Sequence, residues 1–533
     1  MILGSTRSSA ITIHLGIPSF TVFLYLLLWS SQRNVTPNQF FAHEHNATST
    51  LSVPNSQKSS SGTNNVTTQS QSAPPDIKAS IEFHDSNDEF WNTLSRALED
   101  ARPKCPPIVH TPNGLNATDK KHEPLRPHKP RPDNINMTNE AEKELMRAHY
   151  SMRKAAFRLG PDIPFVRNTT GIVVTSSPKQ MPYLLVSLRM LRKTESQLPV
   201  ELFVADQSEY NATMCEGVLR TLNTRCVVMS QIFATKIEHF QYKVFAILLS
   251  SFQNVLFLDS DAFPIHDPTP LFTLRPFSSH GLVVFPDIWG STVSAHYYHI
   301  AGIPEVPIST PLASETGQVL IDKSKHQESF LMTLYYNYYG PSHYYTILSQ
   351  GSAGPGDKDT FIQGATAVDL PFYAVKTSEM GLGRSGGFGG EGFHMLGMAQ
   401  RDPSEDFLYG PPMPNHLHEE DSWDDDDAAD AEGSVALTRP RVPRPMFVHQ
   451  MIFKIRPGLI LRADVNSYKN AEGGWQRMWT SDEDSVKTFG YDAEKVLWEV
   501  LEHVSCLDGI EPEACDKLKE YRAAVFGGSK SSE

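Results

Sequence analysis

Cysteine is scarce in this sequence. Its 533 residues include five, and none of the five forms a Cys-x-x-Cys pair or has the spacing of a Cys/His zinc site. A cysteine-based zinc site is therefore excluded. Cys215 and Cys226 lie close together in the sequence, as do Cys506 and Cys515, and each pair could form a disulfide in an oxidising compartment. Cys105 would then be free or would bridge to a second chain, whereas buried thiols in a reducing compartment are the alternative.

An excess of positive charge is also lacking. The chain has 47 Lys and Arg against 61 Asp and Glu, and its net charge is −14. An acidic balance argues against nucleic acid as the main partner, but it leaves a neutral glycan or a metal-bound nucleotide sugar open. The sequence contains no P-loop, and no Gly-x-Gly-x-x-Gly motif follows its first predicted strand. Two common phosphate-binding signatures are therefore lacking.

Long apolar runs are rare, and the clearest one lies at the N-terminus. Residues Ile11 to Trp29 are largely apolar, which predicts a transmembrane signal-anchor after a short cytosolic tail, residues 1–10. A cleaved signal peptide is the alternative. Seven Asn-x-Thr glycosylation sequons follow the apolar segment and favour a lumenal chain: Asn34, Asn46, Asn65, Asn116, Asn136, Asn168 and Asn211.

Composition divides the remainder of the chain. Residues 30–137 are mostly polar or proline-rich and predict a lumenal stem that is largely disordered, with a possible helix from Ile77 to Ala101. We expect a catalytic domain at 138–526, interrupted by a disordered acidic insertion at about 413–445, and a tail at 527–533. The domain should open with a helix from Asn139 to Leu159, with Asn139 as a possible cap.

From Gly171 onward, short apolar strands alternate with helical segments. Strands are predicted to begin at Gly171, Val200, Cys226, Val255 and Leu282, and a final strand at Phe447. Residues 381–397 are expected to form a glycine-rich loop. The alternation predicts an α/β fold with a mostly parallel, Rossmann-like sheet flanked by helices.

The motif that carries the chemistry is Asp259-Ser-Asp261. It directly follows the apolar run Val255-Leu-Phe-Leu, and ligands in α/β sheets bind at the carboxyl ends of strands. Two carboxylates there are costly unless a cation such as Mg²⁺ or Mn²⁺ with a diphosphate compensates them. The alternative is that both side chains cap the following turn. We interpret the motif as a metal site for glycosyl transfer from a nucleoside diphosphate sugar.

Three further motifs fit this interpretation. Glu315-Thr-Gly-Gln is expected to be a polar turn entering a strand, in which Gly317 could let the chain approach a sugar closely. Asp357 and Asp359 lie in a tight loop before a predicted helix and could contact sugar hydroxyls or cap that helix. His449, at a strand end, could complete the metal shell, although a single histidine is more often structural.

These residues resemble the fungal Golgi α-mannosyltransferases that branch the mannan outer chain. The resemblance extends in order from about Gly171 to Pro457. It is carried by Ser250-Ser-Phe-Gln-Asn-Val-Leu-Phe-Leu-Asp-Ser-Asp-Ala-Phe-Pro, Glu315-Thr-Gly-Gln-Val-Leu-Ile-Asp-Lys, Tyr335-Tyr-Asn-Tyr-Tyr-Gly-Pro, Gly356-Asp-Lys-Asp-Thr-Phe and Phe447-Val-His. It implies a GT-A-like fold, GDP-mannose as donor, Mn²⁺ or another divalent metal, and retention of the α configuration.

The resemblance also implies roles for individual residues. Asp259, Asp261 and His449 would bind the metal, and Asp357, Asp359 and Glu315 are the candidate catalytic carboxylates. The donor-binding set would be Asp259, Asp261, Gly317, Gln318 and Lys358. Lys358 stands between the two aspartates where some relatives have an amide, so the identity of any nucleophile stays open. A same-face reaction without a protein nucleophile is the preferred hypothesis over double displacement.

The implied biology is an α-1,2-mannosyltransferase, a single-pass type II protein of the Golgi membrane. Its partners would be a nucleotide sugar, a mannose-rich glycan of N-glycan outer chains or cell-wall mannan, and the membrane. A Golgi mannosyltransferase complex or homo-oligomer is also possible. The alternatives are an α-1,3-mannosyltransferase, a UDP-sugar-dependent glycosyltransferase, a glycan-binding scaffold paralogue and a secreted structural glycoprotein.

Overall fold

The described part of the chain is a mixed α/β structure. The computed structural model describes residues 77–115, 131–232, 236–306, 313–352, 354–385, 393–411, 441–450, 454–462, 468–470 and 473–527. The predicted cytosolic tail, the anchor at Ile11 to Trp29, the first part of the stem and nearly all of the acidic insertion lie outside these residues. Among the helices within the described ranges, none combines the length and apolar character needed to cross a bilayer.

The main sheet has seven strands in the order β3-β2-β1-β4-β7-β6-β8. Pairs β1/β2, β2/β3, β1/β4 and β6/β8 are parallel, whereas β7 runs antiparallel to both of its neighbours. The α/β prediction is confirmed, with β7 as the reversed strand. The strands are β1 Val166–Thr175, β2 Val200–Val204, β3 Thr224–Val228, β4 Phe252–Leu258, β6 Leu282–Pro286, β7 Ser314–Asp322 and β8 Tyr373–Ala374.

A second sheet of four antiparallel strands has the order β5-β11-β10-β9. Its strands are β5 Ala262–Pro264, β9 Met380–Ser385, β10 Phe393–Arg401 and β11 Pro445–His449. The prediction of a glycine-rich loop at 381–397 is wrong for its two ends, 381–385 and 393–397, which belong to the paired strands β9 and β10, and residues 386–392 lie outside the described part of the chain. The prediction of a final strand at Phe447 is confirmed.

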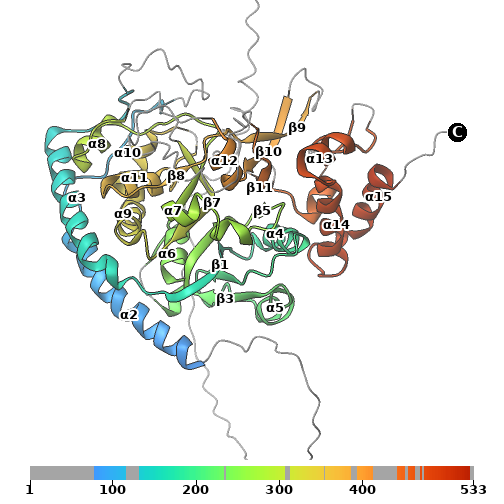
Figure 1. Cartoon of the computed structure of the whole chain (residues 1–533), viewed down its shortest axis with the longest axis horizontal. Helices are drawn as coiled ribbons and strands as arrows, with labels where there is room; N and C mark the ends of the chain where they lie inside the picture. The colour runs from blue at the N-terminus through green and yellow to red at the C-terminus, as the bar shows by residue number, and fades with distance from the viewer. Residues whose placement is uncertain are drawn as a thin grey trace, which may run out of the picture. The chain divides into compact units, whose positions relative to one another are not determined.

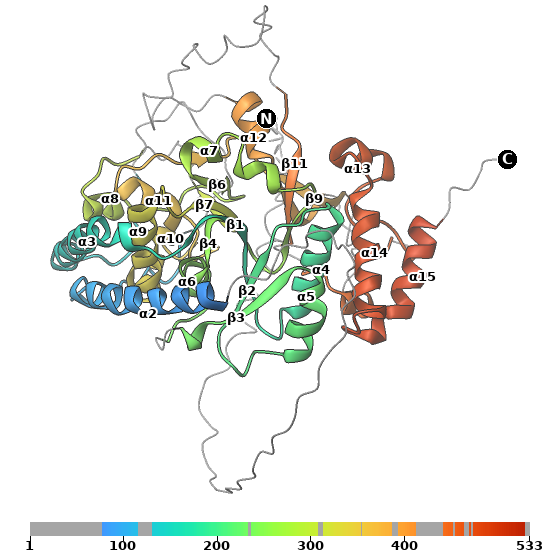
Figure 2. The same cartoon turned by 60° about the horizontal axis from the view of Figure 1, so that its bottom comes forward.

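Helices cover both faces of the main sheet (Figures 1 and 2). Alternate residues of β4 face opposite sides: Val255 and Phe257 belong to one buried apolar cluster, and Leu256 and Leu258 to the other. The helices are α2 Ile77–Asp100, α3 Asn139–Leu159, α4 Met181–Lys193, α5 Leu219–Thr221, α6 Gln241–Leu249, α7 Phe277–His280, α8 Ala295–Ala301, α9 Gln327–Tyr338, α10 Tyr345–Ser349, α11 Thr360–Ala367, α12 Pro403–Tyr409, α13 Asp482–Phe489, α14 Ala493–Cys506 and α15 Cys515–Phe526.

Helix α2 lies inside the range assigned to the stem, yet it is part of the core. Phe90, Trp91, Leu94 and Leu98 are buried in the same apolar cluster as α6 and α9. The compact unit accordingly extends from Lys78 onward, well before residue 138. Helix α3 has the predicted bounds, but its cap is Thr138 rather than Asn139, because the Thr138 hydroxyl accepts from the Ala141 amide.

Both predicted cysteine pairs are disulfides. Cys215 is bonded to Cys226 and Cys506 to Cys515, and Cys105 is a free, half-buried thiol. Each bridge closes a short loop, of 11 and 9 residues in sequence separation respectively. The pairing agrees with a chain that folds in an oxidising compartment.

Candidate active site

Strand pairing brings the predicted metal ligands together. Asp259 and Asp261 follow β4, and the register that pairs Ala262 of β5 with His449 of β11 places the imidazole beside them. His449 Nε2 lies 3.6 Å from Asp261 Oδ1 and 4.0 Å from Asp259 Oδ2. One ligand atom from each of these three residues lies within 4.8 Å of the other two. Two carboxylates and an imidazole at this separation are a donor set that suits a divalent metal.

Glu315 orients the histidine. His449 Nδ1 donates a hydrogen bond to Glu315 Oε2 at 3.0 Å, which leaves Nε2 facing the two aspartates. Burial alone would raise the pKa of Glu315, but the neighbouring His449 outweighs it and holds that pKa below its ordinary value. A carboxylate behind a ligating imidazole fixes the ring's tautomer and increases its basicity. Glu315 therefore occupies the position of a residue that supports the predicted metal ligand His449.

Gly317 makes this arrangement possible. A Cβ atom at this position would lie 2.4 Å from His449 Nδ1 and 2.8 Å from Glu315 Oε2. The predicted reason for the glycine was a close approach to sugar, whereas the structure shows that any side chain would displace the histidine. The prediction that Glu315 to Gln318 form a turn is wrong: all four residues lie in β7, whose antiparallel direction brings its first half to the carboxyl end of β4.

Lys243 links the two acidic motifs and is not among the site residues predicted from the sequence. This buried residue of α6 places Nζ 2.9 Å from Asp357 Oδ2 and 3.4 Å from Asp259 Oδ1. Burial alone lowers the pKa of Lys243, but the carboxylates of Asp259 and Asp357 outweigh it and raise that pKa above its ordinary value. The sequence does carry an indication of this role, because Lys243 is the only lysine in the largely apolar helix Gln241–Leu249. Lysine is almost never buried unless it is paired, so a lysine in such a helix predicts an acidic partner.

Asp357 and Asp359 are held by residues in the N-terminal half of β7. Asp357 Oδ2 accepts from the Thr316 hydroxyl at 3.0 Å, and Asp359 Oδ1 accepts from the Ser314 amide at 2.7 Å. Asp359 has a φ of 64°, and its other carboxylate oxygen is buried without a hydrogen-bond partner. Burial raises its pKa to about 6. A strained backbone and an unpaired buried oxygen are typical of a site where a ligand supplies the missing partner.

The remaining predicted donor-binding residues lie beside this cluster. Gln318 is fully buried, and its amide donates to Glu315 Oε1. Lys358 Nζ lies 3.1 Å from Asp287 Oδ2, just after β6. The roles of both residues in binding a donor stay predictions.

A second lysine outside the predicted set reaches the cluster of Asp259, Asp261 and His449. Lys454 makes an ion pair with Asp261, and its side chain keeps 42% exposure. It follows His449 by five residues and so comes from the segment that leaves β11.

Strand β11 is anchored independently of the site. Arg444 directly precedes it and makes an ion pair with Asp402, with Nη2 2.9 Å from Oδ2. The Arg444 amide donates to Glu405 Oε2 at 2.8 Å, and the Asp402 amide donates to the Arg444 carbonyl. These contacts fasten the start of β11 to the first turn of α12.

Comparison with known proteins connects this geometry to a family. A family model described as "Mannosyltransferase putative" matches residues 169–313 and 309–402, which include every predicted site residue except His449. Alpha-1,2-mannosyltransferase MNN21 of Candida albicans is 31% identical over 448 residues, 73% of this chain and 66% of that protein. Alpha-1,2-mannosyltransferase MNN24 of the same organism is 41% identical over 239 residues, 38% of this chain and 34% of that protein. The chain thus spans between about a third and two thirds of the length of these curated relatives.

Among solved structures, the glycosyltransferase GlyE of Streptococcus pneumoniae covers 39% of this chain at 14% identity, with a TM-score of 0.27. A TM-score of this size carries no weight in assigning a function. The family match and the sequence relatives, together with the motifs assembled around β4, establish that the chain belongs to the mannosyltransferase family.

Proposed function

We propose that this protein is a metal-dependent α-mannosyltransferase that moves mannose from GDP-mannose to α-mannose acceptors and forms an α-1,2 linkage. The observation that carries the proposal is the cluster of Asp259, Asp261 and His449 at the end of β4, in a chain of the mannosyltransferase family. The linkage follows the names of the relatives, which are alpha-1,2-mannosyltransferases. A divalent metal such as Mn²⁺ would stabilise the charge on the departing diphosphate.

The protein's own residues have distinct tasks in this proposal. Asp259, Asp261 and His449 would hold the metal, and Glu315 would keep His449 in the ligating tautomer. Asp359, whose free oxygen is buried, would accept hydrogen bonds from donor-sugar hydroxyls. Lys243 would fix the distance between the metal-binding motif and the Asp357 loop.

Retention of configuration is proposed to follow the same-face route. Glu315 is already engaged by His449 and by the Gly317 amide, and Asp357 by Lys243 and the Thr316 hydroxyl. Carboxylates committed to such partners are poor nucleophiles, which supports a reaction in which the leaving phosphate accepts the acceptor's proton. Azide rescue of Glu315→Ala or Asp357→Ala would instead identify a nucleophile and overturn this route.

The proposed location is the Golgi lumen, in a single-pass type II orientation with Ile11 to Trp29 as the anchor. The two disulfides support an oxidising compartment. The sequon residues Asn136, Asn168 and Asn211 are all exposed and so are accessible for glycosylation. Release of N-glycans from the purified chain, followed by peptide mass spectrometry, tests this proposal, and unmodified asparagine at all sequons would contradict it.

The decisive experiment is a donor and linkage assay. The purified full chain is given Mn²⁺, an α-1,6-linked mannose oligomer and, separately, GDP-mannose, UDP-galactose or UDP-glucose. Transfer from GDP-mannose, with an α-1,2 linkage in the NMR spectrum of the product and loss of activity in Asp261→Asn, is expected. Transfer from a UDP-sugar would overturn the donor, and no transfer by a folded, metal-loaded protein would favour a glycan-binding paralogue.

A further inference from the structure

A second cluster of metal-binding side chains lies between helices α3 and α8. Glu142 comes from the first turn of α3, and His296 and His299 come from α8. Among the residues that the structure describes, this group and the Asp259 cluster are the two that could hold a metal ion. The two groups share no residue, so the second one has no part in the proposed glycosyl transfer.

The geometry of the second cluster matches a small coordination shell. Glu142 Oε1 lies 2.7 Å from His296 Nδ1 and 3.3 Å from His299 Nδ1, and all three ligand atoms lie within 4.8 Å of one another. Ligand atoms 2.0 to 2.1 Å from a tetrahedral zinc ion are about 3.3 Å apart, so His299 already has this separation from Glu142, whereas His296 lies closer to it. His296 and His299 are three residues apart, which places both imidazoles on one face of α8.

The far side of one imidazole has a carboxylate behind it. Asp133 Oδ2 lies 3.7 Å from His296 Nε2, the ring nitrogen opposite the one that faces Glu142. A carboxylate in this position orients a ligating histidine and raises its basicity, as Glu315 does for His449. The segment that carries Asp133 is fixed nearby, because the buried Arg131 donates to the carbonyls of Val293 and Val306 on either side of α8.

Two of the three side chains come from capped first turns. The Thr138 hydroxyl caps α3 four residues before Glu142, and the Ser294 hydroxyl caps α8 two residues before His296. Glu142 and His296 are therefore held by helix ends whose backbone is already fixed, which reduces the entropy lost on binding an ion. The site is also open to solvent, since the His299 side chain is 61% exposed.

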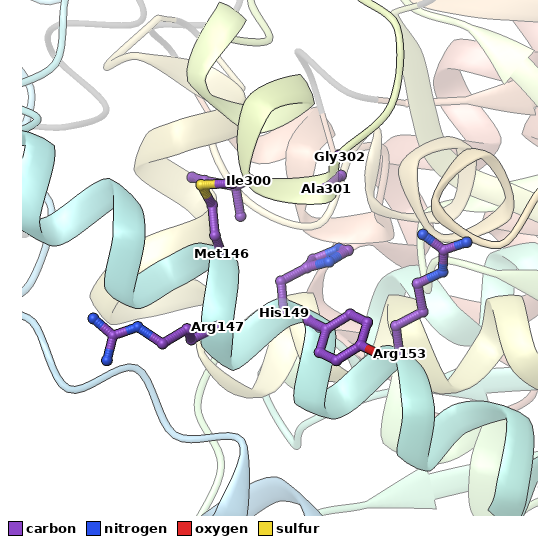
Figure 3. A pocket seen from close by; sticks show the side chains of 8 residues that line it. Met146, Arg147, His149, Arg153, Ile300, Ala301 and Gly302 are labelled. Carbon is purple, nitrogen blue, oxygen red and sulfur yellow. The ribbon is translucent and has the colours of Figure 1, made fainter.

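The same interface is incompletely packed further along α3. Met146, His149 and Arg153 of α3 line a cavity of about 340 Å³ with Ile300 and Gly302 at the end of α8 (Figure 3). An ion bound at Glu142 would connect α3 and α8 at one end of their interface. At the other end, the cavity shows that the two helices are in less complete contact.

We propose that Glu142, His296 and His299 bind a divalent transition metal, with Zn²⁺ as the best match, and that this ion clamps α8 to α3. Two imidazoles and one carboxylate favour zinc, whereas the two carboxylates and one imidazole at Asp259 suit manganese better. The site has three protein ligands from two helices and leaves a fourth position for water.

Metal stoichiometry tests the proposal without an activity assay. The full chain carrying Asp261→Asn, which removes the other site, is stripped with chelator and titrated with Zn²⁺ by calorimetry. One equivalent is expected to bind and to raise the thermal unfolding midpoint. Adding His299→Gln or Glu142→Gln should abolish both effects, whereas His503→Gln at another solvent-accessible histidine should preserve them. Asp133→Asn should weaken Zn²⁺ binding about 10- to 100-fold.

His299→Gln should leave the metal-free unfolding midpoint unchanged, because that side chain is largely exposed. A lost zinc equivalent in a stable variant therefore reports on the site and not on misfolding. Absence of zinc binding in Asp261→Asn, or an equivalent that persists in both His299→Gln and Glu142→Gln, would overturn the proposal. Failure of mannosyl transfer would not affect this result, so the two proposals fail separately.

Discussion

Glu315 and His449 form a hydrogen-bonded pair, Oε2 to Nδ1 at 3.0 Å, that fixes which ring nitrogen faces Asp259 and Asp261. The pair joins β7 of the main sheet to β11 of the second sheet. The donor set proposed for the metal therefore depends on the relative position of the two sheets.

Replacing Glu315 with Gln should weaken Mn²⁺ binding about 10- to 100-fold, because the imidazole loses the carboxylate that orients it. Titration of Mn²⁺ by electron paramagnetic resonance measures the affinity directly. The exposed Glu513→Gln provides a matched control. Unchanged affinity in Glu315→Gln would show that His449 is oriented by other contacts.

Gly317→Ala should abolish metal binding and transfer, since its methyl group would occupy the space of the His449 ring. Gly217→Ala is the matched control, because nothing lies within 4 Å of a Cβ at Gly217 and its backbone φ is not positive. Comparison of transfer rates and Mn²⁺ affinity for the two variants checks the prediction. Unchanged transfer rate and Mn²⁺ affinity in Gly317→Ala would contradict the close approach between Gly317 and the His449 ring.

Lys243→Met should destabilise the metal-free protein by about 3–5 kcal/mol, because Asp259 and Asp357 would be left without their shared cation. Mn²⁺ should recover part of the loss, since the ion also neutralises Asp259. Denaturant unfolding with and without Mn²⁺ measures both effects. Lys236→Met, at a side chain with 87% exposure, should change neither; equal stability of Lys243→Met and the unsubstituted protein would refute the linking role of Lys243.

His149 should make the fold sensitive to acid. Burial lowers its pKa to about 3, while its Nε2 lies 2.7 Å from the Tyr336 hydroxyl. The unfolded chain takes up this proton near pH 6.5 and the folded chain near pH 3, so the folded state loses stability as pH falls through this window. The contribution is about 1.4 kcal/mol per pH unit.

The pH dependence of unfolding in His149→Gln, measured between pH 7.5 and 4.5, checks this assignment. The free energy of unfolding should fall less steeply with decreasing pH in the variant than in the unsubstituted protein. The difference in slope should correspond to about one proton fewer taken up on unfolding. If the variant and the unsubstituted protein had the same pH dependence, the acid sensitivity would be assigned to other buried groups. His326 is the next candidate, because burial lowers its pKa to about 4.

Local sequence predicts much of this fold. Apolar runs that end in polar residues identify β4 and β11, and Asp259, Asp261 and His449, the predicted metal ligands, lie together at their ends. The antiparallel insertion of β7 between β4 and β6 could not be read in the same way, because strand direction depends on pairing between distant segments. For the same reason Glu315 was expected in a turn and Lys243 was not expected at the site.

Helix α2 illustrates the other limit. Its helical character is visible in the sequence, but its neighbours are polar and proline-rich, which favoured a stem. Trp91 and Leu94 are buried against the core, and this contact between distant segments cannot be predicted from local composition. Any truncation intended to remove the stem should therefore retain residues from Ile77 onward.

The contacts between Asp402 and Arg444 make the start of β11 a local determinant of the site. The two side chains form an ion pair and the Asp402 amide donates to the Arg444 carbonyl, so residues 42 positions apart in the sequence meet directly before this strand. The strand that ends in His449 is thus anchored by a contact between two described residues that includes no part of the sequence between them. Asp402 and Arg444 therefore help to set the position of His449 although neither side chain belongs to the Asp259 cluster.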